Sequence, residues 1–276
     1  MADMSGQPLS RRAVVELIGA DTIELLERLV TNTTTDWKPG AARFGALLTP
    51  QGKILAEFIA HRTDEGVLLD VADIVAEDLA KRLKLFRLRA AVEIAVRDDL
   101  GVVLDEAGAP DPRSATLPNR TARERSDGGD AGAFEAARIA AGVPEQGADF
   151  GPGEVFPADV NMDLLGGVDF QKGCFVGQEV VSRMKRRGTA RRRTLTVRGD
   201  NLSVGAAVSA GGAPIGEITS AAGAAALARL RIDRLAKALD AGDALLSDET
   251  PVMIEQPDWL AAEMQAFQSD GSSADA

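Results

Sequence analysis

The chain has 276 residues, of which 45% are hydrophobic and 26% are charged. This balance is typical of a globular protein with a packed core and excludes a disordered or fibrous chain. The basic and acidic residues leave a net charge of −11, which disfavours nonspecific binding to nucleic acid or to an anionic membrane. A single cysteine, Cys174, and a single histidine, His61, exclude a disulfide framework and a cysteine-built zinc site. We therefore expect no metal centre.

Two features predict a cytoplasmic protein. The sequence has no run of 18 or more apolar residues, and its first residues lack the apolar core of a secretory signal. Cys174 would remain a free thiol in a reducing compartment. We therefore expect neither a membrane nor a secreted environment.

The first hundred residues alternate between strand and helix patterns. Residues 13–18 predict a strand, and the apolar spacing after Asp21 predicts a helix. Short strands separated by turns within 43–71 predict a β-meander. Residues 73–89 predict a second helix, and residues 91–96 a further strand. This order is typical of an α+β protein.

The later segments differ sharply in composition. Residues 105–132 are polar and rich in Gly, Pro, Arg and Asp, which predicts an exposed, mobile loop. Residues 150–175 are dense in Gly, Pro, Asp and Asn, as functional loops often are. After Arg193, short strands alternate with glycine turns and predict a small antiparallel barrel. Residues 261–276 are expected to form a frayed tail.

The segment 172–193 contains the strongest candidate for chemistry. Gly173 and Gly177 flank Cys174, so the backbone there can take positive φ or admit a ligand closely. A buried, inert cysteine is the alternative interpretation. Basic residues occupy most of positions 183–193, which predicts an anion-attracting patch or a solvated helix face. Aromatic residues are too few here for a single-strand nucleic-acid binder.

The motif KGCFVGQE at 172–179, followed by SRM and preceded by NMDLLGGVDFQ, resembles the YgfZ family of folate-binding proteins. That family is related to the T-protein, the aminomethyltransferase of the glycine cleavage system. It includes a mitochondrial factor that supports maturation of iron-sulfur proteins. The segments LLTPQGKILAEFIAHR and GAPIGEITS also resemble this family, so the similarity covers nearly the whole chain.

The resemblance implies an aminomethyltransferase-like α+β fold of three domains around a central hole that holds tetrahydrofolate. The first domain would be discontinuous, formed by residues 1–40 and 133–185. Residues 41–132 would form the second domain and residues 186–260 the C-terminal β-barrel. Residues 261–276 would remain a tail.

The resemblance also implies roles for particular side chains, because a folate needs polar partners for its pterin and cations for its glutamate. Cys174 would be the functional thiol. The implied folate-binding residues are Asp159, Asn161 and Gln178 at the pterin and Lys172, Arg183 and Arg187 at the glutamate tail, with Gly173 also in contact with the folate.

Two departures from the T-protein pattern bear on activity. Ala140 stands where the T-protein has its pterin-binding glutamate, so Asp159 would have to substitute for it. Ala56 and Glu57 stand where the T-protein has an acidic pair. Because a missing catalytic carboxylate slows a reaction by orders of magnitude, we expect no glycine-cleavage activity.

The leading hypothesis is a tetrahydrofolate-binding accessory protein for the assembly or repair of iron-sulfur clusters. Its partners would be folate and either client iron-sulfur proteins or cluster-assembly factors. One alternative is a folate-dependent one-carbon transferase acting on a protein or a tRNA, with Glu57 or Asp159 near the folate nitrogens. The other is an RNA-binding or tRNA-modification module that uses the patch at 183–193, although nucleic acid is not the favoured partner.

Overall fold

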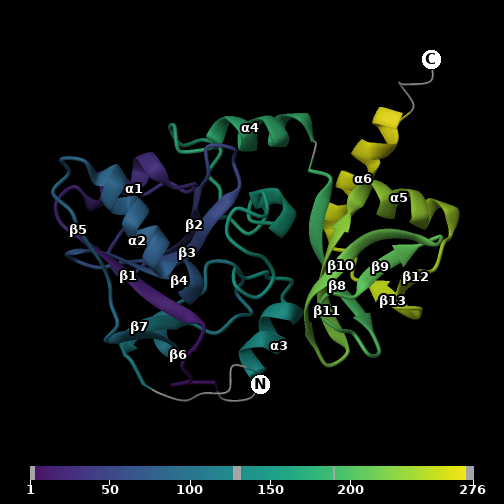
Figure 1. The fold of residues 1–276 in the computed structure, drawn as a ribbon, viewed down its shortest axis with the longest axis horizontal. Coiled ribbons are helices and arrows are strands. Elements are labelled where there is room, and N and C mark those ends of the chain that lie inside the picture. Colours follow the sequence, from purple (N-terminus) through teal and green to yellow (C-terminus); the bar gives the residue numbers. More distant parts are fainter. Residues whose placement is uncertain (1–3, 127–131, 189, 272–276) are drawn as a thin grey trace.

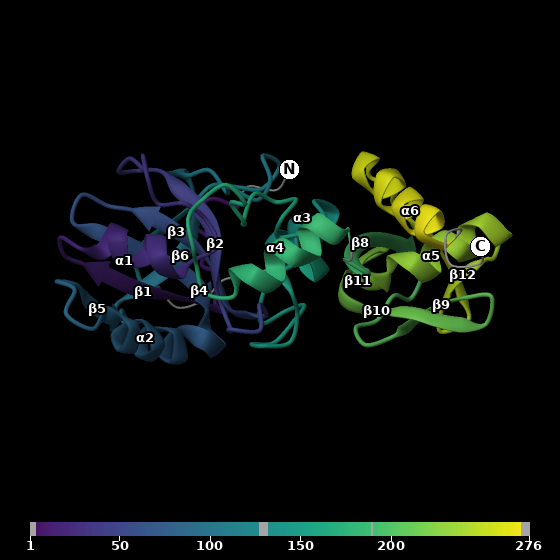
Figure 2. The same ribbon diagram turned by 90° about the horizontal axis from the view of Figure 1, so that it is seen from above.

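The computed structural model describes residues 4–126, 132–188 and 190–271. Two lobes lie along the long axis of the molecule, one built on an open sheet and the other on a barrel (Figure 1). Figure 2 shows helices α3 and α4 between the two lobes. The candidate residues of segment 150–193 therefore lie in the middle of the molecule.

The first lobe is built on a five-stranded antiparallel sheet of order β2-β3-β4-β1-β5. Helices α1 (Thr22–Leu29) and α2 (Asp73–Arg87) cover one face, and their leucines pack on Val15 and Leu17 of β1. Alternation of side chains along β1 points Val14 to the opposite face. The strands are β1 (Arg12–Ile18), β2 (Ala42–Leu48), β3 (Ile54–Arg62), β4 (Gly66–Ala72) and β5 (Glu93–Val96).

The prediction of a mobile loop at 105–132 is wrong for the part that the structure describes. Strands β6 (Leu100–Ala109) and β7 (Arg120–Glu124) pair in an antiparallel hairpin, and Leu117 between them is buried. Asp111, Arg113 and Arg120 of this segment are buried in ion pairs rather than exposed, which composition alone does not reveal. Residues 127–131 lie outside the described part of the chain.

The far face of the sheet is covered by segments from both sides of the hairpin. Helix α3 (Gly132–Ala140) inserts Phe134 beside Val14 of β1. A 3-10 turn, η1 (Pro157–Val160), leads into Met162, which packs on Phe44 of β2. The glycine-rich segment 150–175 is therefore partly a core-forming segment, and it also carries the Cys174 loop.

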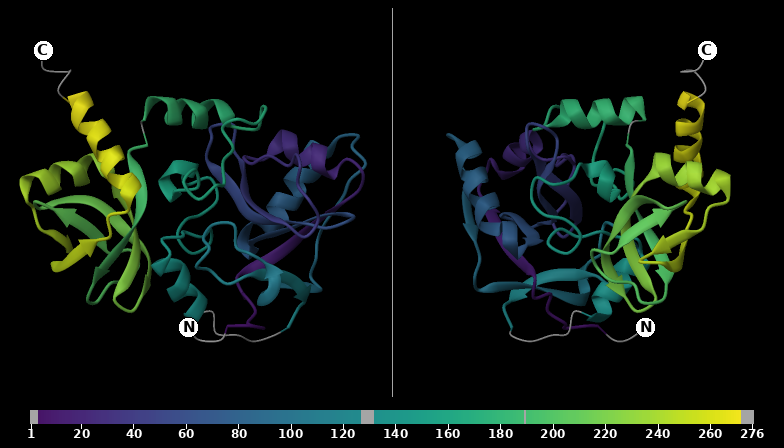
Figure 3. Two further views of the ribbon diagram at one scale, coloured as in Figure 1. Left: turned by 180° about the vertical axis from the view of Figure 1, so that it is seen from behind. Right: turned by 45° about the vertical axis from the view of Figure 1, so that its right-hand side comes forward.

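The second lobe is a closed six-stranded barrel of order β10-β11-β8-β13-β12-β9, which confirms the predicted C-terminal barrel. Helix α5 (Ile232–Ala241) packs on it, and helix α6 (Asp258–Gly271) lies along its side when seen from behind (Figure 3). The strands are β8 (Arg192–Gly199), β9 (Ala207–Ala210), β10 (Ala213–Ala222), β11 (Ala225–Arg231), β12 (Leu245–Ser247) and β13 (Thr250–Ile254).

The predicted tail is a helix as far as Gly271. Leu260 is buried against the barrel core, with Trp259, Met264 and Phe267 packed beside it, so apolar anchoring rather than fraying governs this segment. Residues 272–276 lie outside the described part. None of the described helices is long and apolar enough to cross a membrane.

The sheet joins segments that the sequence analysis placed in different domains. β1, from residues 1–40, pairs with β4, from residues 41–132, over seven residue pairs from Arg12–Ala72 to Ile18–Gly66. The three-domain boundaries remain a prediction. The α+β class with a C-terminal barrel is confirmed.

Candidate functional site

Cys174 lies on a surface loop immediately before α4 (Gln178–Arg187), and its side chain is exposed. The alternative of a buried cysteine is therefore wrong. Phe175, the next residue, is buried against the core below the loop. The loop is thus anchored beside the thiol while the thiol itself faces solvent.

Lys172 fixes the other side of this loop. Its ammonium donates hydrogen bonds to three backbone carbonyl oxygens at the C-terminal end of α1. Glu27 (2.8 Å) lies in the last turn of the helix, and Val30 (2.8 Å) and Asn32 (2.9 Å) follow it. The side chain is 1% exposed, and burial lowers its pKa while Glu27 opposes that shift. All three N–H groups of the ammonium donate to these carbonyls. Lys172 therefore joins the Cys174 loop to the C-terminus of α1 and has no N–H group left for a folate glutamate.

Of the two glycines that flank Cys174, only Gly177 occupies a position where the backbone conformation and the close packing require glycine. Gly177 has φ +80°, and a Cβ there would lie 2.6 Å from the Thr49 carbonyl oxygen, in the turn between β2 and β3. Gly173 has no atom within 4 Å of a Cβ position. Gly177 therefore allows the start of α4 to pack on the first lobe.

The basic residues of 183–193 lie partly on helix α4 and partly at the start of β8, and they do not form one patch. Arg183, Lys185 and Arg186 are exposed. Arg193, by contrast, is buried in ion pairs with Asp163 (2.6 Å) and Glu263. Gln178 is half-buried at the first position of the helix. The side chain of Arg187 lies outside the described part of the structure.

Asp159 has a structural role at the turn η1. Its carboxylate accepts a hydrogen bond from the Phe156 backbone N–H at 3.0 Å, and its carbonyl accepts one from the Thr194 hydroxyl. Burial raises the pKa of Asp159, and the Phe156 hydrogen bond opposes this shift. Asp159 lines neither of the two pockets described next.

Asn161 lines a pocket of about 360 Å³ between the centre of the molecule and the barrel, which we call the Asn161 pocket. Its Nδ2 donates to the Thr194 carbonyl at 2.6 Å, while its Oδ1 is buried without a hydrogen-bond partner among the described residues. An unpaired buried acceptor is costly, so this atom is poised for a donor from a ligand. Trp259 offers an indole ring in the same pocket, and Ala140 also lines it.

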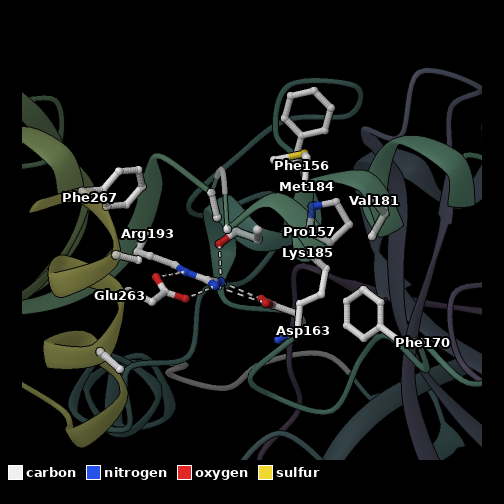
Figure 4. Close-up of a pocket in the computed structure, with 15 residues that line it drawn as sticks. Phe156, Pro157, Asp163, Phe170, Val181, Met184, Lys185, Arg193, Glu263 and Phe267 are labelled. Carbon is white, nitrogen blue, oxygen red and sulfur yellow. Dashed lines mark hydrogen bonds and ion pairs between the residues drawn. The ribbon is translucent and has the colours of Figure 1, made fainter. Parts of the chain in front are cut away.

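A second, more apolar pocket of about 260 Å³ lies between α4 and α6, and we call it the α4–α6 pocket. Figure 4 shows Val181, Met184 and Lys185 of α4 on one side and Glu263 and Phe267 of α6 on the other. Its further lining residues are Phe156, Pro157, Ala158, Asp163, Phe170, Gly188, Ala190, Arg193, Ala262 and Ala266.

A central ion-pair network lies under the far face of the sheet. Arg113 contacts Asp111 through two hydrogen bonds (3.0 and 2.8 Å) and Glu145 through a third (2.9 Å). The network continues to the barrel, because Asp149 accepts a hydrogen bond from the Thr219 hydroxyl at 2.6 Å. Its members, all buried, are Arg12, Asp70, Asp111, Arg113, Arg120, Arg138, Glu145 and Asp149.

Glu57 lies at the edge of this network, and Ala56 beside it is buried in the core under the helices. The Glu57 carboxylate accepts a hydrogen bond of 2.5 Å from the Gln146 backbone N–H. Burial raises the pKa of Glu57 to about 7, although Arg113 and the Gln146 hydrogen bond oppose that shift. Glu57 is therefore a buried carboxyl group of the core rather than half of an acidic pair open to a ligand.

The raised pKa of Glu57 predicts a pH-dependent cost to stability. Since the folded protein binds this proton more tightly than the unfolded chain, stability falls as pH rises from about 4.5 to about 7, by up to about 3 kcal/mol. Glu57→Gln should therefore raise the melting temperature at pH 8 and change it little at pH 5. Calorimetric melts at both pH values check this, with the exposed Glu65→Gln as control. An equal shift at the two pH values would contradict it.

A solved structure with a similar fold is known. The glycine cleavage system aminomethyltransferase T from Bartonella henselae superposes with a TM-score of 0.69 over 93% of this chain and 87% of that one, at 14% identity. This chain has the aminomethyltransferase T fold. The predicted fold is thereby confirmed, and at this identity the similarity concerns the fold alone.

Sequence comparisons give a consistent set of relatives. Residues 191–262 match the family model of the CAF17 C-terminal β-barrel domain. An iron-sulfur cluster assembly factor IBA57 homolog of Mycosarcoma maydis is 31% identical over 66% of this chain and 54% of its own length. Human IBA57, an iron-sulfur cluster assembly factor, is 28% identical over 82% of this chain and 77% of its own. The chain spans about half the length of the fungal relatives.

The predicted cytoplasmic location is contradicted by these relatives, which are named as mitochondrial proteins. The prediction depended on the lack of an apolar segment and on a free cysteine. Mitochondrial targeting segments are amphipathic and Arg-rich rather than apolar, so the first feature does not discriminate between the two locations.

Proposed function

We propose that this protein is an accessory factor for iron-sulfur cluster assembly in which Cys174 is the functional thiol. The observation that carries the proposal is the exposed Cys174 on a loop held by Lys172, in a chain whose relatives are named iron-sulfur cluster assembly factors. An exposed thiol on an anchored loop can reach a partner protein without rearrangement of the fold. Its partners are therefore client iron-sulfur proteins or other assembly factors.

The chemistry available to a single cysteine limits this role. Protein-bound clusters take several thiolates, and the described residues contain no group of three or more Cys, His, Asp or Glu side chains that could hold a metal ion. Cys174 would therefore supply one ligand, or one transient thiol contact, to a cluster whose other ligands come from the partner.

We further propose that tetrahydrofolate binds in the Asn161 pocket. A pterin ring presents N–H donors that fit the unpaired Asn161 Oδ1, and its flat face fits the Trp259 indole. Ala140 stands where the T-protein has its pterin-binding glutamate, so no carboxylate is available there. Asn161, rather than Asp159, would supply the hydrogen-bond acceptor for the pterin. The aminomethyltransferase T fold supports a folate ligand, and within this pocket the ligand would be oriented by hydrogen bonding and would pack against Leu164, Leu165 and Trp259.

A one-carbon transferase is not favoured by these positions. Glu57 is buried beside the central ion-pair network, and Asp159 caps the turn η1. Neither carboxylate lines the Asn161 pocket, so neither is placed to organise attack on a bound folate. The buried Arg193 also removes a cation from the patch that an RNA-binding module would need.

Cys174→Ser should reduce the activity of client iron-sulfur enzymes to the level of cells that lack the protein. Serine preserves the size of the side chain but removes the thiolate, so the loop is expected to keep its structure. The measurement is the specific activity of an iron-sulfur enzyme in a deletion strain complemented with either form. Gln171→Ser, an exposed change on the same loop, is the control and should complement fully. Full complementation by Cys174→Ser would refute the role of the thiol.

A further inference from the structure

The α4–α6 pocket is distinct from the Asn161 pocket. Arg193 lines the first, and its guanidinium lies 5.7 Å from the ring of Trp259, which lines the second. Its two carboxylate partners, Asp163 and Glu263, also line the α4–α6 pocket. Arg193 and these partners thus form a wall between the pockets, and a folate in one does not occupy the other.

The shape and lining of the α4–α6 pocket suit an apolar side chain. Phe156, Phe170, Met184 and Phe267 are the largest apolar side chains that line it (Figure 4). Its buried charges are already matched, since Asp163 and Glu263 both pair with Arg193. A volume of about 260 Å³ is smaller than most cofactor sites and suits one or two large side chains. Such pockets hold the anchor residues of protein interfaces.

The exposed cations of α4 indicate the charge of the partner, although only Lys185 among them lines the pocket. Arg183, Lys185 and Arg186 are exposed on α4, and the structure pairs none of them with a carboxylate within its described ranges. Lys185 itself lines the pocket, with its ammonium 5.4 Å from the Phe170 ring. In a chain of net charge −11, this exposed cationic helix complements an acidic surface.

We propose that the α4–α6 pocket and the cations of α4 together form a docking site for an acidic segment of a protein partner. One aromatic or large aliphatic side chain of that segment enters the pocket, and acidic residues beside it pair with Lys185. The inference rests on the proposed function, because Cys174 needs a protein partner. Since α4 has ten residues and a rise of about 1.5 Å each, docking at its end holds the partner within roughly 15–20 Å of the thiol.

The test uses a fluorescein-labelled synthetic peptide with one Phe flanked on each side by three Glu residues, and a second peptide with Ser in place of Phe. Fluorescence anisotropy with the full chain should show binding of the Phe peptide, weakening at high salt, and at least about tenfold weaker binding of the Ser peptide. Absence of binding, or equal binding of the two peptides, would overturn the proposal.

Matched variants locate the site. Ala262→Trp fills the pocket from α6, and Lys185→Glu reverses the charge at its mouth. Each should weaken binding of the Phe peptide about tenfold or more, whereas the exposed controls Ala261→Trp and Lys237→Glu should leave it unchanged. Unchanged binding to Ala262→Trp would overturn the pocket as the anchor site. Circular dichroism melts verify that each variant folds.

The two levels of the proposal fail separately. If Cys174→Ser supports client enzymes fully while peptide binding follows the pattern above, the docking site stands and the proposed function fails. If Ala262→Trp and Lys185→Glu bind the Phe peptide as wild type does while Cys174→Ser abolishes client activity, the function stands and the docking site fails. Tetrahydrofolate titration of Ala262→Trp should match wild type, because the wall around Arg193 separates the pockets.

Discussion

Arg113→Met is expected to destabilise the protein by about 3–5 kcal/mol at pH 7. Arg113 is buried between β6 and β7, where it pairs with Asp111 and Glu145. Methionine has a similar length but no charge, so Glu145 would lose its nearest cation, and Asp111 would lose one of its two arginine partners, in a buried site. Urea unfolding monitored by circular dichroism measures the change.

The same substitution should also move acid unfolding to higher pH. Burial raises the pKa of Asp111, but Arg113 and Arg120 outweigh it and hold that pKa at about 2. Asp111 therefore contributes stability that is complete above about pH 4 and is lost as the pH falls toward 2. Without Arg113 the folded pKa of Asp111 rises and this stabilisation shrinks, so unfolding begins at a higher pH.

A surface pair on the same hairpin supplies the control. Arg123 pairs with Asp105 and is 56% exposed, so Arg123→Met should cost no more than about 1 kcal/mol. Comparable losses from the two variants, or an unchanged acid transition in Arg113→Met, would contradict a stabilising role for the buried network.

Lys172→Met is expected to lower the free energy of unfolding by about 3 kcal/mol, which corresponds to roughly 6–12 °C in melting temperature. The substitution leaves the carbonyls of Glu27, Val30 and Asn32 without the ammonium that they share. Carbonyls at a helix C-terminus have no donors within the helix, so buried ones depend on such a partner. The Cys174 loop loses its anchor on α1 at the same time.

Two measurements separate this role of Lys172 from ligand binding. Thermal melts without any ligand should already show the loss, while the exposed Lys38→Met should melt like wild type. The rate of Cys174 alkylation by iodoacetamide should change in Lys172→Met, because the loop is no longer held in one position. A wild-type melt and a wild-type alkylation rate together would show that Lys172 does not position the loop.

The sequence predicted the fold well where periodicity carries the information. The strands and helices between residues 12 and 96 follow apolar spacing, and the alternation after Arg193 correctly predicted a barrel. The prediction of an exposed loop at 105–132 is wrong because charged residues such as Asp111, Arg113 and Arg120 are usually exposed to solvent, whereas here they are buried. Their burial depends on partners such as Asp70 and Glu145, far away in the sequence.

The candidate site was only partly predictable for a related reason. Cys174 was recognisable because it is the only cysteine and lies in a specific motif. Lys172 and Arg193 belong to the same stretch but serve the interior, since their carbonyl and carboxylate partners come from α1 and α6. No local pattern encodes such contacts. The α4–α6 pocket is not predictable from these patterns, because its α6 wall lies in a segment whose composition predicts a tail.

Calorimetric titration with tetrahydrofolate, comparing wild type with Asn161→Gly, tests the account most directly. Asn161 has φ +58°, which glycine adopts without strain, so the variant removes the amide while preserving the backbone. Asn201→Gly, an exposed position with φ +56°, is the control. We predict that wild type and Asn201→Gly bind alike and that Asn161→Gly binds about tenfold more weakly or worse. Absence of binding by wild type, or equal binding by all three, would contradict the folate pocket.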